Sequence, residues 1–306
     1  MPMAAAGAEA PPVDIKKILS KSAKRALGGG ASGAAAAGVQ VLSLMWLRTT
    51  MNYQYRNGGS TVDALTTLYA EGGVPRLYRG LPFALLQGPL SRFGDTAANA
   101  GVIALLDALP ATQALPLPLK SAGGSIAAGL WRIALTPIDT IKTTLQVVGE
   151  GGGEVVLKRL QAEGPSALFQ GAVATSVATM VGHYPWYLTY NALGEWLPMA
   201  PAGDELLRLG RAALMGVCAS SVSDCCSNSI RVIKTAKQTS PEQITYTQAL
   251  KSVLDEGGVP GLFGRGLQTR LVANGLQGAL FSVLWKFFET KFAAGSVAAA
   301  TAVLLQ

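Results

Sequence analysis

The sequence predicts an all-α membrane protein, with six long apolar helices arranged as three copies of one unit. Hydrophobic residues make up 49% of the 306 residues and charged residues only 14%, whereas a soluble domain usually carries about 25% charged residues. The 36 glycines lie largely among alanines and serines inside the apolar segments, a composition typical of closely packed membrane helices. Related motifs also recur at intervals of about 92 residues, which indicates an internal repeat.

The repeat is clearest at three Glu-Gly steps, Glu71-Gly72, Glu163-Gly164 and Glu256-Gly257. Each follows a short amphipathic segment, and we expect the glycine to end that helix in the left-handed conformation. An aromatic residue and a second glycine then open a new apolar segment. These openings are Tyr78-Arg79-Gly80, Phe169-Gln170-Gly171 and, with one extra glycine, Phe263-Gly264-Arg265-Gly266.

Each unit therefore contains an apolar helix, a short surface helix and a second apolar helix. The six apolar helices are predicted at 22–52, 81–108, 119–147, 172–198, 206–238 and 267–300, each long enough to cross about 30 Å of hydrocarbon. The domains are a disordered, basic N-terminal segment at 1–21 and repeats at 22–109, 119–199 and 205–300. The basic stretch 14–25 is interpreted as the interfacial start of the first helix or, alternatively, as an organelle-targeting segment.

One motif carries most of the chemistry: Pro137-x-Asp139-x-x-Lys142, followed by Gln146. The proline redirects the lower half of the helix, and an acid and a base three residues apart share one helix face. Around a three-fold axis, the base of one repeat can pair with the acid of another. Such ion pairs can close one end of a cavity and open again.

The other two copies depart from this pattern. Repeat one has Ser43, Met45, Arg48 and Asn52, and repeat three has Ser229, Arg231, Lys234 and Gln238. The motif positions thus hold a single acid, Asp139, and four bases. A ring of three ion pairs is impossible, so at most one or two bases pair with Asp139. The others must be solvated, hold an anion or find another acid.

With these motifs the chain resembles the mitochondrial carrier family from about residue 22 onward, as a divergent member with degenerate first and third signatures. The resemblance implies three repeats, each of two transmembrane helices joined by a short matrix-side surface helix. It also implies transport by alternating access across the inner mitochondrial membrane. The family's second gate motif, at the ends of the even helices, is eroded here: Tyr190-Asn191-x-x-Gly194 lacks both charges, and Trp285-Lys286 and Glu289 reverse the charge order.

The resemblance also assigns candidate substrate contacts on the even helices. Transferred by position, they are Gln87 and Gly88, Ala178 and Thr179, and Ala273 and Asn274. Arg92 and His183 lie further along the same helices, and His183 is alternatively a core histidine. Arg132 and Asp224 lie within helices three and five and are candidates to pair with each other. A basic interior favours an anionic solute.

Arg79, Gly80 and Gly171 resemble the family's cardiolipin sites, because free N–H groups at a helix start bind the phosphate of cardiolipin or another anionic lipid. The alternative is a simple helix-start turn. For function, the sequence predicts transport of a small anionic metabolite. The alternative is a carrier-fold protein that no longer transports and is a structural partner in a membrane complex. Its membrane is predicted to be the mitochondrial inner membrane, with the outer membrane or a plastid envelope as alternatives.

Other classes of protein are not favoured. An enzyme is not expected, because no nucleophile and base occur together, and no cofactor is implied. A metal site is not expected from one histidine, His183, a lone Cys218 and the adjacent Cys225-Cys226. Nucleic acid is not an expected partner, because no dense basic run is interleaved with aromatic residues.

Overall fold

The computed structural model describes Lys16, Ser20 and residues 30–199, 201, 204–278 and 280. This part of the chain is helical and contains no strand. The predicted N-terminal segment 1–21 lies almost wholly outside the described residues, as do 281–300 with Trp285, Lys286 and Glu289.

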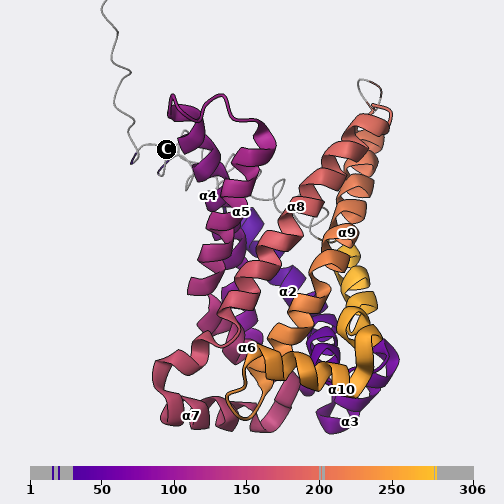
Figure 1. Cartoon of the computed structure of the whole chain (residues 1–306). Coiled ribbons are helices and arrows are strands. Elements are labelled where there is room, and N and C mark those ends of the chain that lie inside the picture. The colour runs from indigo at the N-terminus through magenta and orange to yellow at the C-terminus, as the bar shows by residue number, and fades with distance from the viewer. Residues whose placement is uncertain are drawn as a thin grey trace, which may run out of the picture.

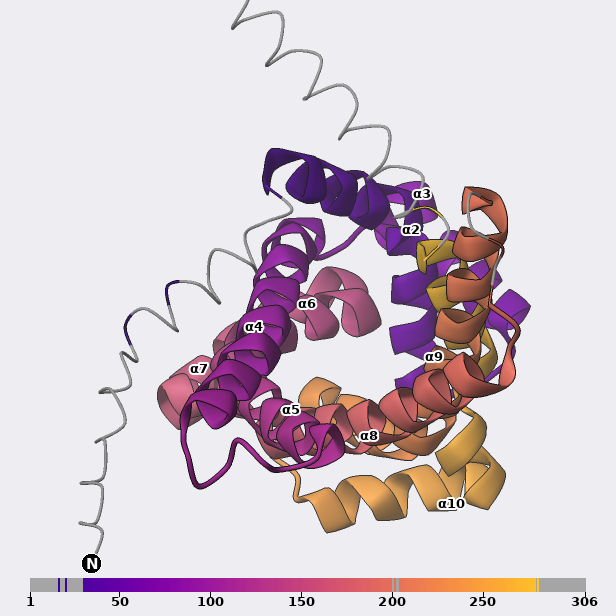
Figure 2. The same cartoon turned by 90° about the horizontal axis from the view of Figure 1, so that it is seen from above.

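The helices follow the predicted order within each repeat (Figure 1). Repeat one contains α2 (Gly30–Asn57), α3 (Thr61–Leu77) and α4 (Leu81–Ala108). Repeat two contains α5 (Leu117–Ala134), α6 (Thr136–Val148), η1 (Gly149–Gly151), α7 (Gly152–Glu163), η2 (Gly164–Phe169) and α8 (Ala172–Trp196). Repeat three contains α9 (Glu205–Thr239), α10 (Tyr246–Gly264) and a last helix that begins at residue 267 and is described to 278. The long helices surround a central space, and α3, α7 and α10 lie at one end (Figures 1 and 2).

Proline divides the third apolar segment. The segment predicted at 119–147 is two helices, α5 and α6, separated at Leu135, with Pro137 in the first turn of α6. Proline has no N–H to donate to the preceding turn, so it is tolerated at a helix start and interrupts a helix interior. Ser43 and Ser229 occupy the corresponding positions in α2 and α9, and both of those helices continue without a break.

The glycines that open the even helices hold the repeats together. Gly80, Gly171 and Gly266 all have positive φ angles, of 83°, 83° and 66°. A Cβ added at Gly80 would lie 3.1 Å from the Lys142 carbonyl oxygen, and one at Gly171 would lie 2.8 Å from Cγ of Gln238. Each even helix therefore starts against an odd helix of the following repeat, at a distance that only glycine permits.

The Glu-Gly steps end or kink the surface helices, but not with the predicted geometry. Gly164 ends α7 with φ 69° and ψ −163°, and in the other repeats it is the second glycine, Gly73 or Gly258, that has positive φ. The ψ values of −150° to −163° place these residues in an extended region that is accessible essentially only to glycine. The predicted left-handed cap is therefore wrong. Pro165 directly follows Gly164 and favours extended backbone there, whereas Val74 and Val259 separate Gly73 and Gly258 from the next proline.

Three buried arginines join each surface helix or its connection to an odd helix of the following repeat. Their guanidinium groups donate to main-chain carbonyls at the ends of α6, α9 and α2. The contacts are Arg76 Nη1 to Gln146 O (2.7 Å), Arg159 Nη1 to Gln238 O (2.7 Å) and Arg265 Nη1 to Arg56 O (3.2 Å). A cation is favourable at a helix C-terminus, where the last carbonyls lack helical partners. Burial lowers the pKa of Arg159 below its ordinary value, while Glu163 acts in the opposite direction.

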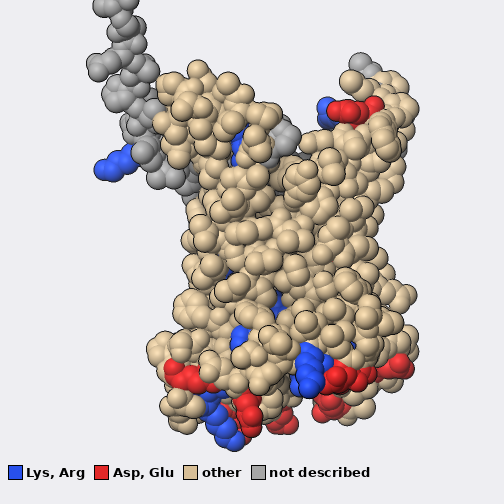
Figure 3. All heavy atoms as spheres, viewed as in Figure 1, with Lys and Arg blue, Asp and Glu red and all other residues tan. Residues whose placement is uncertain are grey.

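The outer surface of the long helices is largely apolar. Leu130, Val173, Leu188 and Leu276 are among the large apolar side chains that are exposed there. In Figure 3 the charged side chains gather mainly around the end that carries α3, α7 and α10, with a largely uncharged belt above them. Within the described residues, no helix combines the length and the apolarity expected of a membrane span.

The packing of the helix-opening glycines predicts the effect of a single methyl group. Gly171→Ala should lower the free energy of unfolding by about 2 kcal/mol, because alanine is strained at positive φ and its Cβ overlaps Gln238. Thermal unfolding of the purified protein in detergent measures this loss. Gly153→Ala is the matched control, since Gly153 lies in α7 with nothing within 4 Å of an added Cβ. Equal stability of the two variants would contradict the packing role.

Candidate functional site

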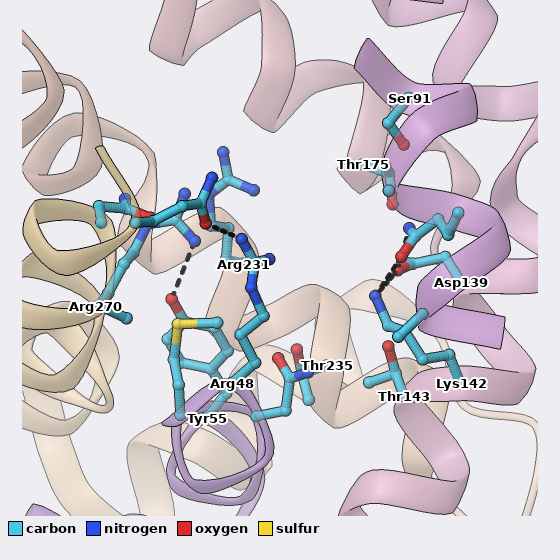
Figure 4. A pocket seen from close by; sticks show the side chains of 18 of the residues that line it. Arg48, Tyr55, Ser91, Asp139, Lys142, Thr143, Thr175, Arg231, Thr235 and Arg270 are labelled. Carbon is cyan, nitrogen blue, oxygen red and sulfur yellow. Dashed lines mark hydrogen bonds and ion pairs between the residues drawn. The ribbon is translucent and has the colours of Figure 1, made fainter. Parts of the chain in front are cut away.

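A central cavity of about 380 Å³ lies between the long helices (Figure 4), within the usual size range of small-molecule sites. All three repeats contribute to its walls. The polar lining includes Arg48, Asn52, Tyr55, Gln87, Ser91, Arg132, Asp139, Lys142, Thr143, Thr175, Thr179, His183, Arg231, Lys234, Arg270, Asn274 and Gln277. Towards the end that carries the surface helices, the fully buried amides of Gln146 and Gln238 pack between the helices.

Asp139 holds one wall of the cavity together. Its carboxylate is buried and accepts hydrogen bonds from Lys142 Nζ (2.9 Å) and Gln87 Nε2 (2.7 Å) through Oδ1, and from Lys234 through Oδ2. Lys142 also donates to the side-chain oxygen of Gln87. Because Gln87 lies in α4, Asp139 and Lys142 in α6 and Lys234 in α9, this cluster joins helices from all three repeats.

The opposite wall carries the other two signature bases (Figure 4). Arg48 donates to the side-chain oxygen of Gln277, and Arg231 Nε donates to Ser227 Oγ at 3.3 Å. Met45, at the acid position of repeat one, is fully buried. Among the described residues, no carboxylate forms an ion pair with Arg231. The signature positions on this wall therefore form no counterpart of the Asp139 cluster.

Arg132 and Asp224 do not pair with each other, so that prediction is wrong. Arg132 pairs with Asp95 of α4, with Nε 3.2 Å from Oδ1. Asp224 pairs with Arg270 of the last helix, whose Nε lies 2.6 Å from its carboxylate. The partner of Arg132 thus lies on a helix of repeat one, whereas the partner of Asp224 lies on the other long helix of its own repeat.

The transferred contact positions mostly reach the cavity. Gln87, Gly88, Thr179, Ala273 and Asn274 line it, whereas Ala178 is fully buried between helices. Asn274 donates to Asp224, which lies buried behind the cavity wall. His183 and Arg132 also line the cavity. Arg92 belongs to α4, but its side chain lies outside the described residues. Binding of a solute by these residues stays a prediction.

Several residues in or next to the cavity were missed by sequence reasoning. Arg270, Gln277, Tyr55 and Ser91 line it, and Asp95 pairs with the lining residue Arg132. All five lie outside the signature and outside the transferred positions. For Asp95 and Arg270 a signal existed, since charged residues within membrane helices usually face the interior. Gln277, Tyr55 and Ser91 carried no such signal, because uncharged polar residues occur throughout the helices.

The sequence of the chain matches a known protein family. The model of the mitochondrial carrier protein family matches residues 20–104, 113–200 and 206–296, which correspond to the three repeats. The chain belongs to the mitochondrial carrier family. The carrier is thus a membrane protein of six transmembrane helices in three repeats, each with a short surface helix. Peroxisomal adenine nucleotide transporter 1 of Eremothecium gossypii is 26% identical to this carrier over 194 residues. That match covers 58% of the carrier and 57% of the relative, so the carrier spans little more than half of the relative's length.

The candidate lipid sites of the carrier lie at the starts of α4 and α8. Gly80 and Gly171 are the N-caps of these helices, and Arg79 lies beside Gly80, with Nη2 3.9 Å from the exposed Glu150. At the start of α8, the Ala174 N–H donates to the Tyr246 hydroxyl at 3.2 Å, which leaves fewer free donors for a phosphate. Both glycines have a packing role, and lipid binding stays a prediction.

The Asp139 cluster predicts a large loss of stability when its charge is removed. Asp139→Asn leaves Lys142 and Lys234 without their shared carboxylate in a buried site, and the expected loss is about 3 kcal/mol. Thermal unfolding measures it, with Glu150→Gln as the control because Glu150 is 95% exposed. A double variant with Lys234→Met should lose less than the sum of the two single losses. Additive losses would contradict the coupling between α6 and α9.

Proposed function

We propose that this carrier moves a small, multiply charged anionic metabolite by alternating access across the mitochondrial inner membrane. The observation that carries the proposal is the charge of the cavity. Six basic residues line it: Arg48, Arg132, Lys142, Arg231, Lys234 and Arg270. Three carboxylates, Asp95, Asp139 and Asp224, pair with members of this set. Within the described residues, three positive charges therefore stay in excess.

An excess of buried positive charge favours an anion strongly. Charges in a membrane interior are expensive unless they are paired or solvated in a water-filled path. A solute with two or more negative charges offsets that cost, and the field of the cavity concentrates such solutes at its mouth. A cationic or neutral solute gains neither effect.

The Asp139 cluster supplies a reversible closure for alternating access. Its contacts between α6 and α9 consist of one ion pair, which can form in one state and separate in the other. A conformational equilibrium responds to differences of a few kcal/mol between two states, which is the scale of such a contact. The gate is thus strong enough to close the cavity and weak enough to open.

The open cavity favours transport over a purely structural role. A carrier-fold protein that is only a structural partner does not need a cavity lined by Arg48, Arg132 and Arg231. The eroded signatures support the structural alternative only if another interaction cannot replace the missing ion pairs. The similarity to a peroxisomal adenine nucleotide transporter adds adenine nucleotides to the candidate anions and the peroxisomal membrane to the candidate locations.

Uptake into proteoliposomes tests the proposal. The purified carrier should accumulate at least one labelled anion from a panel of phosphate, di- and tricarboxylates and adenine nucleotides. Lys142→Ala and Arg231→Ala should each lower the initial rate at least about tenfold, which corresponds to about 1.4 kcal/mol. Lys158→Ala removes an equal charge from an exposed position of α7 and should leave the rate unchanged.

The structural alternative makes the opposite prediction. If no anion of the panel moves and the protein purifies with a large membrane complex, transport is wrong and the structural role is supported. The membrane is tested separately by fractionating cells that express the tagged chain. Recovery with peroxisomes, plastids or the mitochondrial outer membrane would contradict the proposed location and leave the transport proposal intact.

A further inference from the structure

Arg231 occupies the acid position of the third signature, where repeat two has the carboxylate of Asp139. In repeat two the acid position, Asp139, pairs with the signature base of repeat three, Lys234. The three-fold arrangement gives the acid position of repeat three a corresponding neighbour, the signature base of repeat one. Those two residues are Arg231 and Arg48. The site of an expected ion pair therefore holds two guanidinium groups, which lie on the same wall of the cavity (Figure 4).

No neighbouring carboxylate resolves this conflict within the described residues. Asp224, two turns before Arg231 on α9, accepts from Arg270 at 2.6 Å and also from Asn274. Asp139 pairs with two lysines on the opposite wall. For Arg231 itself, the structure shows one neutral contact, the 3.3 Å hydrogen bond to Ser227. Among the described residues, no carboxylate forms an ion pair with Arg231, and the nearby Asp224 is already bonded to Arg270.

We propose that a compact oxyanion group of the transported solute binds between Arg231 and Arg48 and takes the place of the missing carboxylate. The solute itself then completes the closure between α9 and α2. This inference rests on the proposed function, because it assigns a subsite to the anion that the cavity carries. A phosphate or a carboxylate group has the required chemistry, since two guanidinium forks bind oxygens of either group with paired hydrogen bonds.

The rest of the cavity suits a solute with a polar body. The Ser91 hydroxyl is buried, lies on the wall opposite Arg231 and has no hydrogen-bond partner in the described structure (Figure 4). Such an unsatisfied buried group favours a ligand that bonds to it. The Thr175 side chain lies near it on the same wall. The expected solute therefore has an anionic group that binds Arg231 and a hydroxyl or amide group that bonds to Ser91.

Binding of the anionic group should favour the conformation of this structure, in which α2 and α9 lie close together. α2 and α9 approach each other in this structure, and separating them would move Arg48 away from Arg231 and weaken their joint hold on an anion. A ligand stabilises the state that it binds more tightly. The anion therefore closes the gate, and an introduced carboxylate at position 231 should do the same permanently.

Thermal unfolding of the full-length chain in detergent tests this, at constant ionic strength in chloride, inorganic phosphate or malonate. For the wild type, phosphate or malonate should raise Tm by about 5 °C over chloride at saturation. Arg231→Glu should have a high Tm in chloride and gain nothing from either anion. The matched control is Lys251→Glu, which has the same charge change at an exposed position of α10 and should keep the wild-type gain.

The outcomes separate the subsite from the proposed function. A wild-type gain that persists in Arg231→Glu overturns the inference, as does the absence of any gain with both anions. A larger gain with phosphate than with malonate indicates that the anionic group is a phosphoryl group, and the reverse indicates a carboxylate. If Arg231→Glu does not fold, Arg231→Gln should bind the better anion at least tenfold more weakly by calorimetry, and unchanged affinity overturns the subsite. Anion binding without uptake of any solute keeps the subsite and overturns transport.

Discussion

The Asp139 carboxylate is the contact on which the arrangement of the cavity depends. It is the single acid of the three signatures, and it lies buried between Lys142 and Lys234 with Gln87 as a third partner. A buried carboxylate is tolerated only when cations and donors surround it. Its two oxygens therefore fix α4, α6 and α9 relative to one another and leave α2 outside the ion-paired cluster. The asymmetry of the gate follows from this one residue.

Beneath this asymmetric gate, the frame keeps its three-fold pattern. Arg76, Arg159 and Arg265 each bind the end of an odd helix, and Gly80, Gly171 and Gly266 each let an even helix start close to an odd one. These contacts involve main-chain carbonyls and close packing. They do not depend on the charge order of the signatures, so two signatures could lose their acids without loss of the fold. The absence of acids from the first and third signatures changes how the cavity closes.

The sequence predicted the parts of this structure that depend on local chemistry. The order of the helices, the i,i+3 contact of Asp139 with Lys142 and the limit of two bases on Asp139 all follow from residue type and spacing. Pro137 was expected to redirect one helix over 119–147, and the structure has two helices there. The partners of Arg132 and Asp224 do not follow from residue type and spacing, because they depend on how each helix is rotated. Asp95 and Arg270 lie closer than either predicted partner. Likewise, a Glu-Gly pair predicts a stop, but it does not determine which glycine takes a positive φ angle or which ψ angle that glycine adopts.

A solute that completes a gate must also leave it. If the group bound between Arg231 and Arg48 gained as much free energy as a permanent buried ion pair, the closed state would trap it. Two like charges oppose each other in the empty site, and part of the binding free energy offsets that repulsion. The net free energy gained when the solute binds and the helices close is thereby reduced, while the dependence of closure on the anion is kept. Two arginines on one wall thus give a site whose closure the solute favours and that still releases it.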